Sequence, residues 1–269
     1  MKKMLHTIYI CIVLIYCTSS AAADRVLILK SGNIPIINET ADALKSEWHK
    51  GSDIVTIKSS SETINTDDYA AAVAIGSKAS TVLKSNHRKG FPAVYSLVLS
   101  PSEIDLFTSG FVGISPSPDF NSMLSDLNQR IGAIKTVGVI YSGNSEYLLE
   151  PLEGAAAKMN ISVEAKRVSG KYEIAGALNE FKKIDLFYLM PDPLLCNETS
   201  MVQIFSFFNK TYTPTVGTYK IALMFGASYA YTVEYSEVGK TLAKEVSLML
   251  ENTNYRPKMI YLNGRLYTK

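Results

Sequence analysis

Short apolar runs alternate with helix-length periodic segments along most of this chain. In the second half, apolar runs at residues 136–141 and 185–190 each end in small or polar residues and then enter an amphipathic stretch. Residues 214–217 repeat this pattern and lead into Thr218 and Tyr219. Short runs rich in β-branched and aromatic residues, alternating with helical segments, indicate βα units and a parallel sheet. The pattern therefore predicts an α/β fold.

The first half of the chain follows the same rhythm, and the rhythm restarts after residue 133. The expected strands are residues 25–30, 54–57, 71–75, 91–97, 111–114, 136–141, 161–165, 185–190, 213–217 and 227–231. The expected helices are residues 38–48, 77–86, 120–131, 146–159, 174–182, 195–209, 221–225 and 237–251. No Gly/Ser-rich linker separates the halves, so we predict two parallel-sheet lobes joined by a hinge, with a cleft between them.

The N-terminus has the pattern of a secretory signal peptide. Lys2 and Lys3 precede an apolar stretch at about residues 8–16, and residues 21–23 are three alanines. The apolar stretch is too short to span a membrane, which takes about 20 residues. We therefore expect residues 1–23 to be removed and the protein to act in the periplasm or another extracytoplasmic compartment.

Cys17 offers an alternative N-terminal processing site. Residues 14–17 loosely resemble a lipobox, whose cysteine carries a lipid anchor. The bulky Tyr16 stands where that motif has a small residue, so cleavage after Ala23 is the favoured interpretation.

Charge and cysteine content exclude several classes of protein. Removal of Lys2 and Lys3 lowers the basic count from 27 to 25, equal to the 25 acidic residues. A neutral chain without a block of Lys or Arg lacks the electrostatic footprint of a nucleic-acid-binding protein. Cys196 would be the one cysteine left, so no internal disulfide can form and stability must come from a core.

The sequence contains no recognisable catalytic or metal motif. It has no HExxH, CxxC, P-loop, GxSxG or GxGxxG pattern. His49 lies at an expected helix end and His87 in an expected solvated loop, and neither belongs to a triad or metal spacing. An exported hydrolase would require Cys196 or a serine to meet one of these histidines in space. We expect no enzyme activity and no cofactor.

The chemistry that the chain does offer is a row of hydroxyl-bearing turns at the ends of strands. These residues are Ser31, Ser77, Ser142, Ser145 and Thr218. Parallel sheets bind ligands in the crevice at the carboxyl ends of their strands, where helix N-termini present free amides. Each residue could instead only cap its own helix, as Ser77 is placed to do. Several such turns at successive strand ends favour a shared ligand crevice.

Tyrosines crowd the segment after the last turn, and we include Tyr219 as a wall for an apolar or aromatic ligand.

Five short segments match a known sequence pattern. They are residues 73–80, similar to VAIGTPAA; 136–141, similar to RIGVLY; 188–192, similar to LYLPPD; 214–218, similar to PVFGT; and 233–239, similar to VDYYELG. By their order and spacing the chain, over residue 25 to about 261, resembles the substrate-binding proteins of ABC transporters. The resemblance is to the group related to tryptophan- and tyrosine-binding lipoproteins.

This resemblance implies a type I periplasmic-binding-protein fold. In that fold, two Rossmann-like lobes are joined by three crossovers and close over a small ligand. Lobe one would comprise residues 24–133 and 234–254, and lobe two residues 134–233 and 255–269, with a C-terminal strand. The resemblance also implies ligand contacts at Ser77, Ser142, Asp192, Thr218 and Glu234.

Departures from the family pattern bear on the ligand. Lys78 stands in place of a proline, Lys220 where an acidic residue is common, and Glu234 in place of aspartate. If Lys78 and Lys220 reach the crevice, they favour an anion over an amino acid, whose ammonium needs carboxylates. The alternative is that both lysines lie on the surface. Amino-acid-like molecules and small anions therefore both remain open as ligands.

The sequence thus predicts an exported, monomeric solute-binding protein of an ABC-type uptake system. Its partners would be a small-molecule ligand and a membrane permease. The alternative is a periplasmic sensor that passes its ligand state to a membrane signalling protein.

Overall fold

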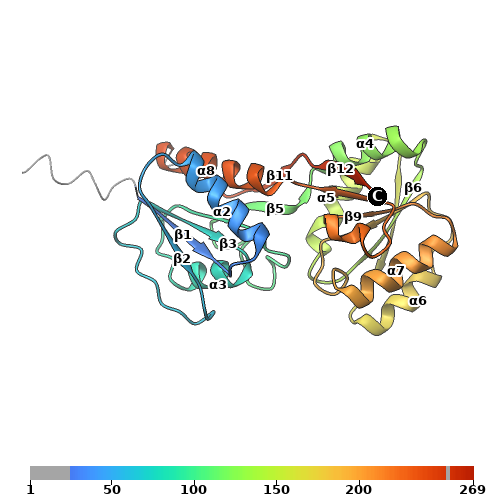
Figure 1. Cartoon of the computed structure of the whole chain (residues 1–269), viewed down its shortest axis with the longest axis horizontal. Coiled ribbons are helices and arrows are strands. Elements are labelled where there is room, and N and C mark those ends of the chain that lie inside the picture. The colour runs from blue at the N-terminus through green and yellow to red at the C-terminus, as the bar shows by residue number, and fades with distance from the viewer. Residues whose placement is uncertain (1–24, 253–254) are drawn as a thin grey trace, which may run out of the picture.

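The computed structural model describes residues 25–252 and 255–269, which form two lobes side by side (Figure 1). The expected signal peptide, residues 1–23, and the alternative lipid site at Cys17 lie outside these residues. In the described part of the chain, no helix combines the length and hydrophobicity that a membrane crossing requires.

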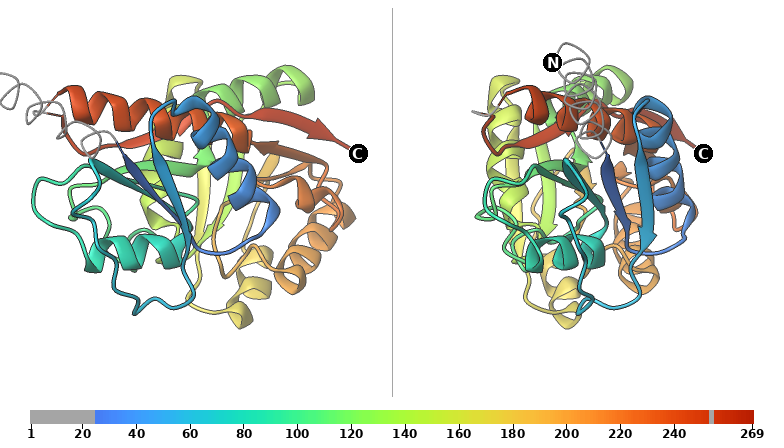
Figure 2. Two further views of the ribbon diagram at one scale, coloured as in Figure 1. Left: turned by 60° about the vertical axis from the view of Figure 1, so that its left-hand side comes forward. Right: turned by 90° about the vertical axis from the view of Figure 1, so that its left-hand side faces the viewer.

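The first lobe is built on a six-stranded parallel sheet of order β11-β5-β4-β3-β1-β2. Its strands are β1 (Val26–Lys30), β2 (Ser52–Thr56), β3 (Ala71–Ile75), β4 (Ala93–Ser96), β5 (Val112–Pro118) and β11 (Met259–Leu262). Its helices are α2 (Pro35–Glu47), α3 (Ser77–Ser85) and α8 (Tyr235–Glu251). Although α2 and α8 are far apart in the sequence, they lie side by side (Figure 2).

Alternation along the buried strands distributes the core of this lobe over both faces of the sheet. Val26 and Ile28 of β1 pack in the cluster that contains α2 and α8. Leu27 and Leu29 pack in the cluster that contains α3. Because successive side chains of a strand point to opposite faces, a wholly apolar strand requires cover on both sides.

Gly239 allows the close contact between α8 and α2. A Cβ at this position would lie 2.4 Å from the carbonyl oxygen of Thr40 and 2.7 Å from the Cβ of Ala43. The absence of a side chain therefore sets the separation of the two helices that cover one face of the first lobe.

The second lobe repeats the plan with a sheet of order β12-β10-β9-β8-β6-β7, parallel except for β12. Its strands are β6 (Thr136–Tyr141), β7 (Ser162–Arg167), β8 (Leu186–Leu189), β9 (Thr215–Gly217), β10 (Tyr229–Thr232) and β12 (Arg265–Thr268). α4 (Phe120–Ile131) and α5 (Leu149–Lys158) cover one face, and α6 (Ile174–Asn179) and α7 (Glu198–Lys210) cover the other. Three 3₁₀ turns, η1 (Glu146–Leu148), η2 (Lys171–Glu173) and η3 (Lys220–Leu223), complete it.

Within the described residues, the chain passes between the lobes three times: from β5 to α4, from β10 to α8, and from β11 to β12. Two of these crossings differ from the expected lobe boundaries. α4, expected in lobe one, packs through Phe120, Met123, Leu124 and Leu127 into the core of the second lobe. β11, expected in lobe two, pairs with β5 in the first sheet.

The predicted α/β class with two Rossmann-like parallel-sheet lobes is confirmed. The largest local differences lie in short elements. The expected helix at residues 221–225 is the 3₁₀ turn η3, and the C-terminal segment holds two strands, one for each sheet. Because β12 is antiparallel to β10, the second sheet is not wholly parallel.

Candidate functional site

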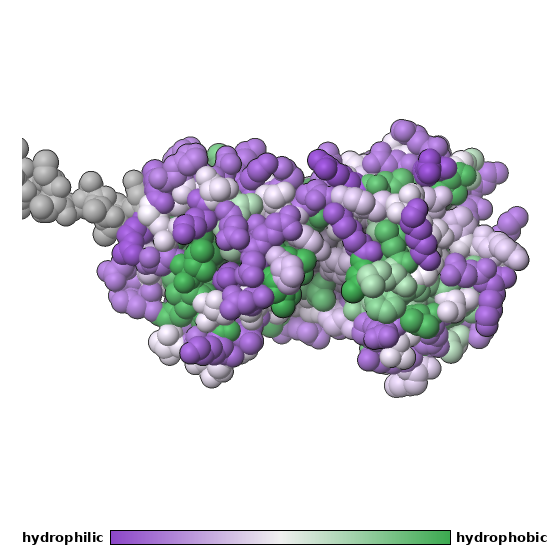
Figure 3. Space-filling view, in the orientation of Figure 1, coloured by the Kyte–Doolittle hydropathy of each residue, from purple (hydrophilic) through white to green (hydrophobic). Residues whose placement is uncertain are grey.

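A cavity of about 560 Å³ lies between the two lobes, at the carboxyl ends of their parallel strands. Both lobes and the crossings line it, with Ser31, Ile34, Ile36, Ile37, Gly76, Ser77, Leu97, Leu99, Pro116, Cys196, Tyr219, Lys220, Ile221 and Tyr235. The space-filling view shows the hollow between the lobes with hydrophobic residues on both of its sides (Figure 3). We define this cavity as the cleft.

Ser31, which directly follows β1, connects that strand to α3, the helix that follows β3. Its hydroxyl accepts a hydrogen bond from the Ala79 N–H of α3 at 2.9 Å. Gly76, at φ 92°, makes room for this contact, because a Cβ there would lie 2.6 Å from Ser31 Oγ. The expectation that Ser77 caps α3 is wrong. The N-cap is Gly76, the capping hydroxyl comes from Ser31, and Ser77 is an exposed first residue that lines the cleft.

The structure brings Ser142, Ser145 and Asp192 together as a buried cluster, which we call the Asp192 clasp. Asp192 has no exposed surface. Its Oδ2 accepts from the Ser142 hydroxyl at 2.7 Å, the Ser145 hydroxyl at 2.6 Å and the Ser142 N–H at 3.1 Å. Its Oδ1 accepts from the Leu194 N–H at 2.8 Å. None of the three clasp residues lines the cleft, so in this structure the clasp joins the turns after β6 and β8.

Thr218 belongs to a second buried network, which crosses between the lobes. Its hydroxyl lies 2.7 Å from the Leu189 carbonyl oxygen and 3.2 Å from the Tyr188 hydroxyl. Tyr188 in turn lies 3.0 Å from Ser117 Oγ of β5. Burial raises the pKa of Tyr188 to about 12, so the hydroxyl stays protonated. This network links the second sheet to β5, the strand of the first sheet from which the chain crosses to the second lobe.

Glu234 and Lys220 form an ion pair at the edge of the cleft. Lys220 Nζ lies 3.5 Å from Glu234 Oε1 and 4.1 Å from the centre of the Tyr267 ring. The Tyr267 hydroxyl donates to Glu234, which holds the pKa of that carboxyl below its ordinary 4.5. Lys78 is placed differently, because its ammonium donates to the Lys58 carbonyl oxygen at 3.3 Å and the residue does not line the cleft.

Two features between the lobes are not predicted by the sequence pattern. The first is the apolar lining that Ile34 and Ile36 supply from the first lobe and Ile221 from the second. Each of them follows a strand-end turn, and this position was the available signal. The second is a contact between Phe107 of the first lobe and Tyr147 of the second, with ring centres 5.4 Å apart. The Tyr147 hydroxyl is buried without a hydrogen-bond partner among the described residues, and burial raises its pKa.

The residues considered for catalysis make other contacts. His87 Nε2 lies 2.9 Å from the Phe91 carbonyl oxygen, and its ring packs on Phe111. His49 is exposed at the end of α2. The Cys196 thiol donates to the Met190 carbonyl oxygen at 3.2 Å, and burial raises its pKa to about 12, which disfavours the nucleophilic thiolate. Across the described ranges, 25–252 and 255–269, no group of three metal-ligating side chains is present.

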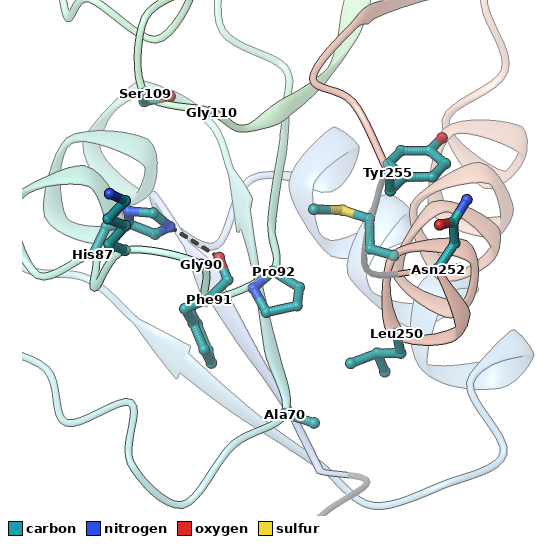
Figure 4. Close-up of a pocket in the computed structure, with 12 residues that line it drawn as sticks. Ala70, His87, Gly90, Phe91, Pro92, Ser109, Gly110, Leu250, Asn252 and Tyr255 are labelled. Atoms are coloured by element: carbon teal, nitrogen blue, oxygen red, sulfur yellow. Dashed lines mark hydrogen bonds between the residues drawn. The ribbon is translucent and has the colours of Figure 1, made fainter.

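A second cavity, of about 750 Å³, belongs to the first lobe alone. It lies between the loop around His87, residues Ser109 and Gly110, and the C-terminal end of α8 with Tyr255 (Figure 4). Closure of one lobe on the other would not bring a second wall to it. The cleft is therefore the better candidate for a ligand that both lobes hold.

A family model described as "ABC transporter substrate binding protein" matches residues 29–257. No curated protein matches the sequence significantly.

Several solved structures share the fold. A conserved domain protein from Vibrio cholerae is 18% identical, with a TM-score of 0.58 over 91% of this chain and 92% of that one. An ABC domain from Streptococcus pneumonia in complex with L-Trp is 15% identical, with a TM-score of 0.58 over 90% of each chain. A ligand-free, open substrate-binding protein with adhesive properties from Clostridium difficile is 17% identical, with a TM-score of 0.63 over 88% of this chain and 89% of that one.

Proposed function

This chain belongs to the family of ABC transporter substrate-binding proteins, and from that premise we propose that it closes its two lobes over a small organic ligand and delivers it to a membrane permease. The family consists of binding proteins rather than enzymes, and its members act outside the cytoplasm with an ABC permease as partner. Export by cleavage after Ala23 and a monomeric state complete the proposal.

The cleft is the observation that carries this proposal. Its volume of about 560 Å³ falls within the range of roughly 300–1,000 Å³ that is usual for small-molecule sites. Ile34 and Ser77 approach it from the first lobe, and Tyr219 and Ile221 approach it from the second. A ligand that contacts both walls is bound better when the lobes are closed, so ligand binding shifts the population towards the closed form.

The lining bears on the two ligand classes that the sequence leaves open. Most of its side chains are aliphatic or aromatic, and its one charged residue, Lys220, is already paired with Glu234. A small anion without an apolar body would depend on Lys220 alone, because Lys78 is directed to the Lys58 carbonyl oxygen. The lining therefore supports the apolar body of an amino-acid-like ligand. The Streptococcus relative was solved in complex with L-Trp, which agrees with a ligand of this size.

The sensor alternative has the same fold and a different membrane partner. Family membership favours delivery to a permease, because the matched family is defined by ABC transport. Genes for a permease and an ATPase beside this one would support the proposal, and genes for a receptor kinase or cyclase would support the sensor.

Thermal unfolding of the mature chain with a library of small metabolites tests the proposal. At a ligand concentration of 100 times Kd, binding adds about 2.7 kcal/mol, which raises Tm by about 5–10 °C. Ile221→Glu places a charge in the apolar wall and should abolish this rise. Val202→Glu adds the same charge at an exposed position of α7, away from the cleft, and should retain it. A complete absence of stabilising compounds would contradict the proposal.

A further inference from the structure

The cleft combines apolar walls with a lack of free carboxylates. Ile34, Ile36, Leu97 and Leu99 line it from the first lobe, and Ile221 lines it from the second. Ile34 and Ile221 are about half exposed, at 51% and 50%, so apolar surface is available to a ligand. Such walls favour an apolar ligand body, because each Å² of apolar surface removed from water contributes about 25 cal/mol.

An ammonium group in such a cleft needs an anionic acceptor, and Asp192 does not provide one. Its two oxygens accept four hydrogen bonds from Ser142, Ser145 and Leu194, and the side chain has no exposed surface. An ammonium could reach Asp192 only after the clasp had opened, at the cost of hydrogen bonds to a buried charge.

Glu234 is also already paired. It accepts from the Tyr267 hydroxyl and forms the ion pair with Lys220 at 3.5 Å. Of this pair, Lys220 lines the cleft and Glu234 does not. The charged side chain that lines the cleft is therefore a cation, which repels a second cation.

The remaining polar groups of the lining are not charged. They include the hydroxyls of Ser77, Tyr219 and Tyr235, and burial raises the pKa of Tyr219 and Tyr235, so both stay protonated. The Ser31 hydroxyl already accepts from Ala79. A buried charge without a counter-charge costs far more than a neutral polar group.

We propose that the cleft binds an apolar organic molecule without a cationic group, such as an aryl or branched-chain carboxylic acid, and discriminates against free amino acids. This inference rests on the proposed function, since it requires that the cleft closes over a ligand. The lining of the cleft favours the apolar body of an amino acid and disfavours its ammonium group.

Calorimetry at pH 7 with three matched series tests this inference. The series are tryptophan, indole-3-propionate and tryptamine; tyrosine, 3-(4-hydroxyphenyl)propionate and tyramine; and leucine, 4-methylpentanoate and isoamylamine. In each series that binds, the acid without an ammonium should bind at least tenfold tighter than the amino acid, and the amine should bind most weakly. An amino acid or amine that binds as tightly as its acid would overturn the inference.

Lys220→Gln provides an independent test. It removes the cation that repels a ligand ammonium and leaves Glu234 without its ion-pair partner, so the ratio of acid to amino-acid affinity should fall at least threefold. Lys78→Gln, which removes a cation outside the lining of the cleft, is the matched control and should keep the wild-type ratio. An unchanged ratio in Lys220→Gln would overturn the inference.

The two levels of the proposal can fail separately. If the three series do not bind and a library compound does, a cationic hit or a hit without an apolar body overturns the inference, and an apolar hit without a cationic group supports it. If no compound stabilises the protein, the proposed function fails, and the inference fails with it.

Discussion

Asp192→Asn should destabilise the protein, because Asp192 holds two turns together from within the second lobe. Four donors surround its carboxylate, three at Oδ2 and one at Oδ1. Asparagine can keep an oxygen at the Oδ2 position, but its amide nitrogen would then face the Leu194 N–H. The amide nitrogen is a donor in the place of the acceptor Oδ1, so it cannot bond to the Leu194 N–H. The three hydrogen bonds at the remaining oxygen persist, but their acceptor is no longer charged.

The expected loss in the free energy of unfolding is about 3 kcal/mol, since a hydrogen bond to a charged group contributes about 1.5–3 kcal/mol and an unsatisfied buried group costs about 1–3 kcal/mol. For a chain of this size, Tm would fall by about 6–12 °C. Urea unfolding at pH 7, followed by far-UV circular dichroism, measures the difference directly, provided that the slope m is unchanged.

Asp185→Asn is a matched control in the same lobe. Asp185 Oδ2 accepts from the N–H groups of Lys135 and Thr136, but the side chain is only half-buried. We expect a loss of about 1 kcal/mol there. Equal losses for the two variants, or a loss below 0.5 kcal/mol for Asp192→Asn, would refute the structural role of the clasp.

Three further predictions concern other parts of the molecule. Gly239→Ala should cost about 2–3 kcal/mol in urea unfolding, because its Cβ would meet the Thr40 carbonyl oxygen at 2.4 Å; Gly154→Ala, with open space around it, should be neutral or slightly stabilising. The free energy of unfolding should fall as the pH drops from about 4.5 through the lowered folded-state pKa of Glu234, because the unfolded state binds more protons in that range. Glu234→Gln should reduce this dependence of the free energy of unfolding on pH. An unchanged dependence would contradict the Tyr267 contact as the cause of the lowered pKa. Tyr147→Phe removes a buried hydroxyl without a hydrogen-bond partner and should leave Tm unchanged or raise it; a fall of more than 4 °C would show that the hydroxyl is satisfied in solution.

The sequence pattern predicted the strands and helices wherever local signals were strong. Residues 71–75, 120–131 and 136–141 have the predicted bounds, since each is a continuous apolar or periodic segment with clear flanks. Asp119, whose side chain accepts from the Ser122 N–H, caps the helix at 120–131. β11 and β12 lacked such a signal, because each is only four residues long and pairs with a strand distant in the sequence.

The candidate site was predicted as a set of turns but not as a set of contacts. Ser31, Ser77 and Tyr219 line the cleft, whereas Ser142, Ser145 and Asp192 bond to one another. Sequence alone could not reveal this, because Asp192 meets its serine partners 50 and 47 residues away along the chain. A carboxylate at a strand end could equally well bind a ligand or join two turns, and only its surroundings decide which.

Small-angle X-ray scattering of the mature chain, with and without a ligand that calorimetry shows to saturate it, tests the two-lobe closure most directly. The account predicts that the radius of gyration falls on saturation in the wild type, and that Ile221→Glu keeps the ligand-free profile. An unchanged profile for the saturated wild type would contradict closure of the lobes over the cleft.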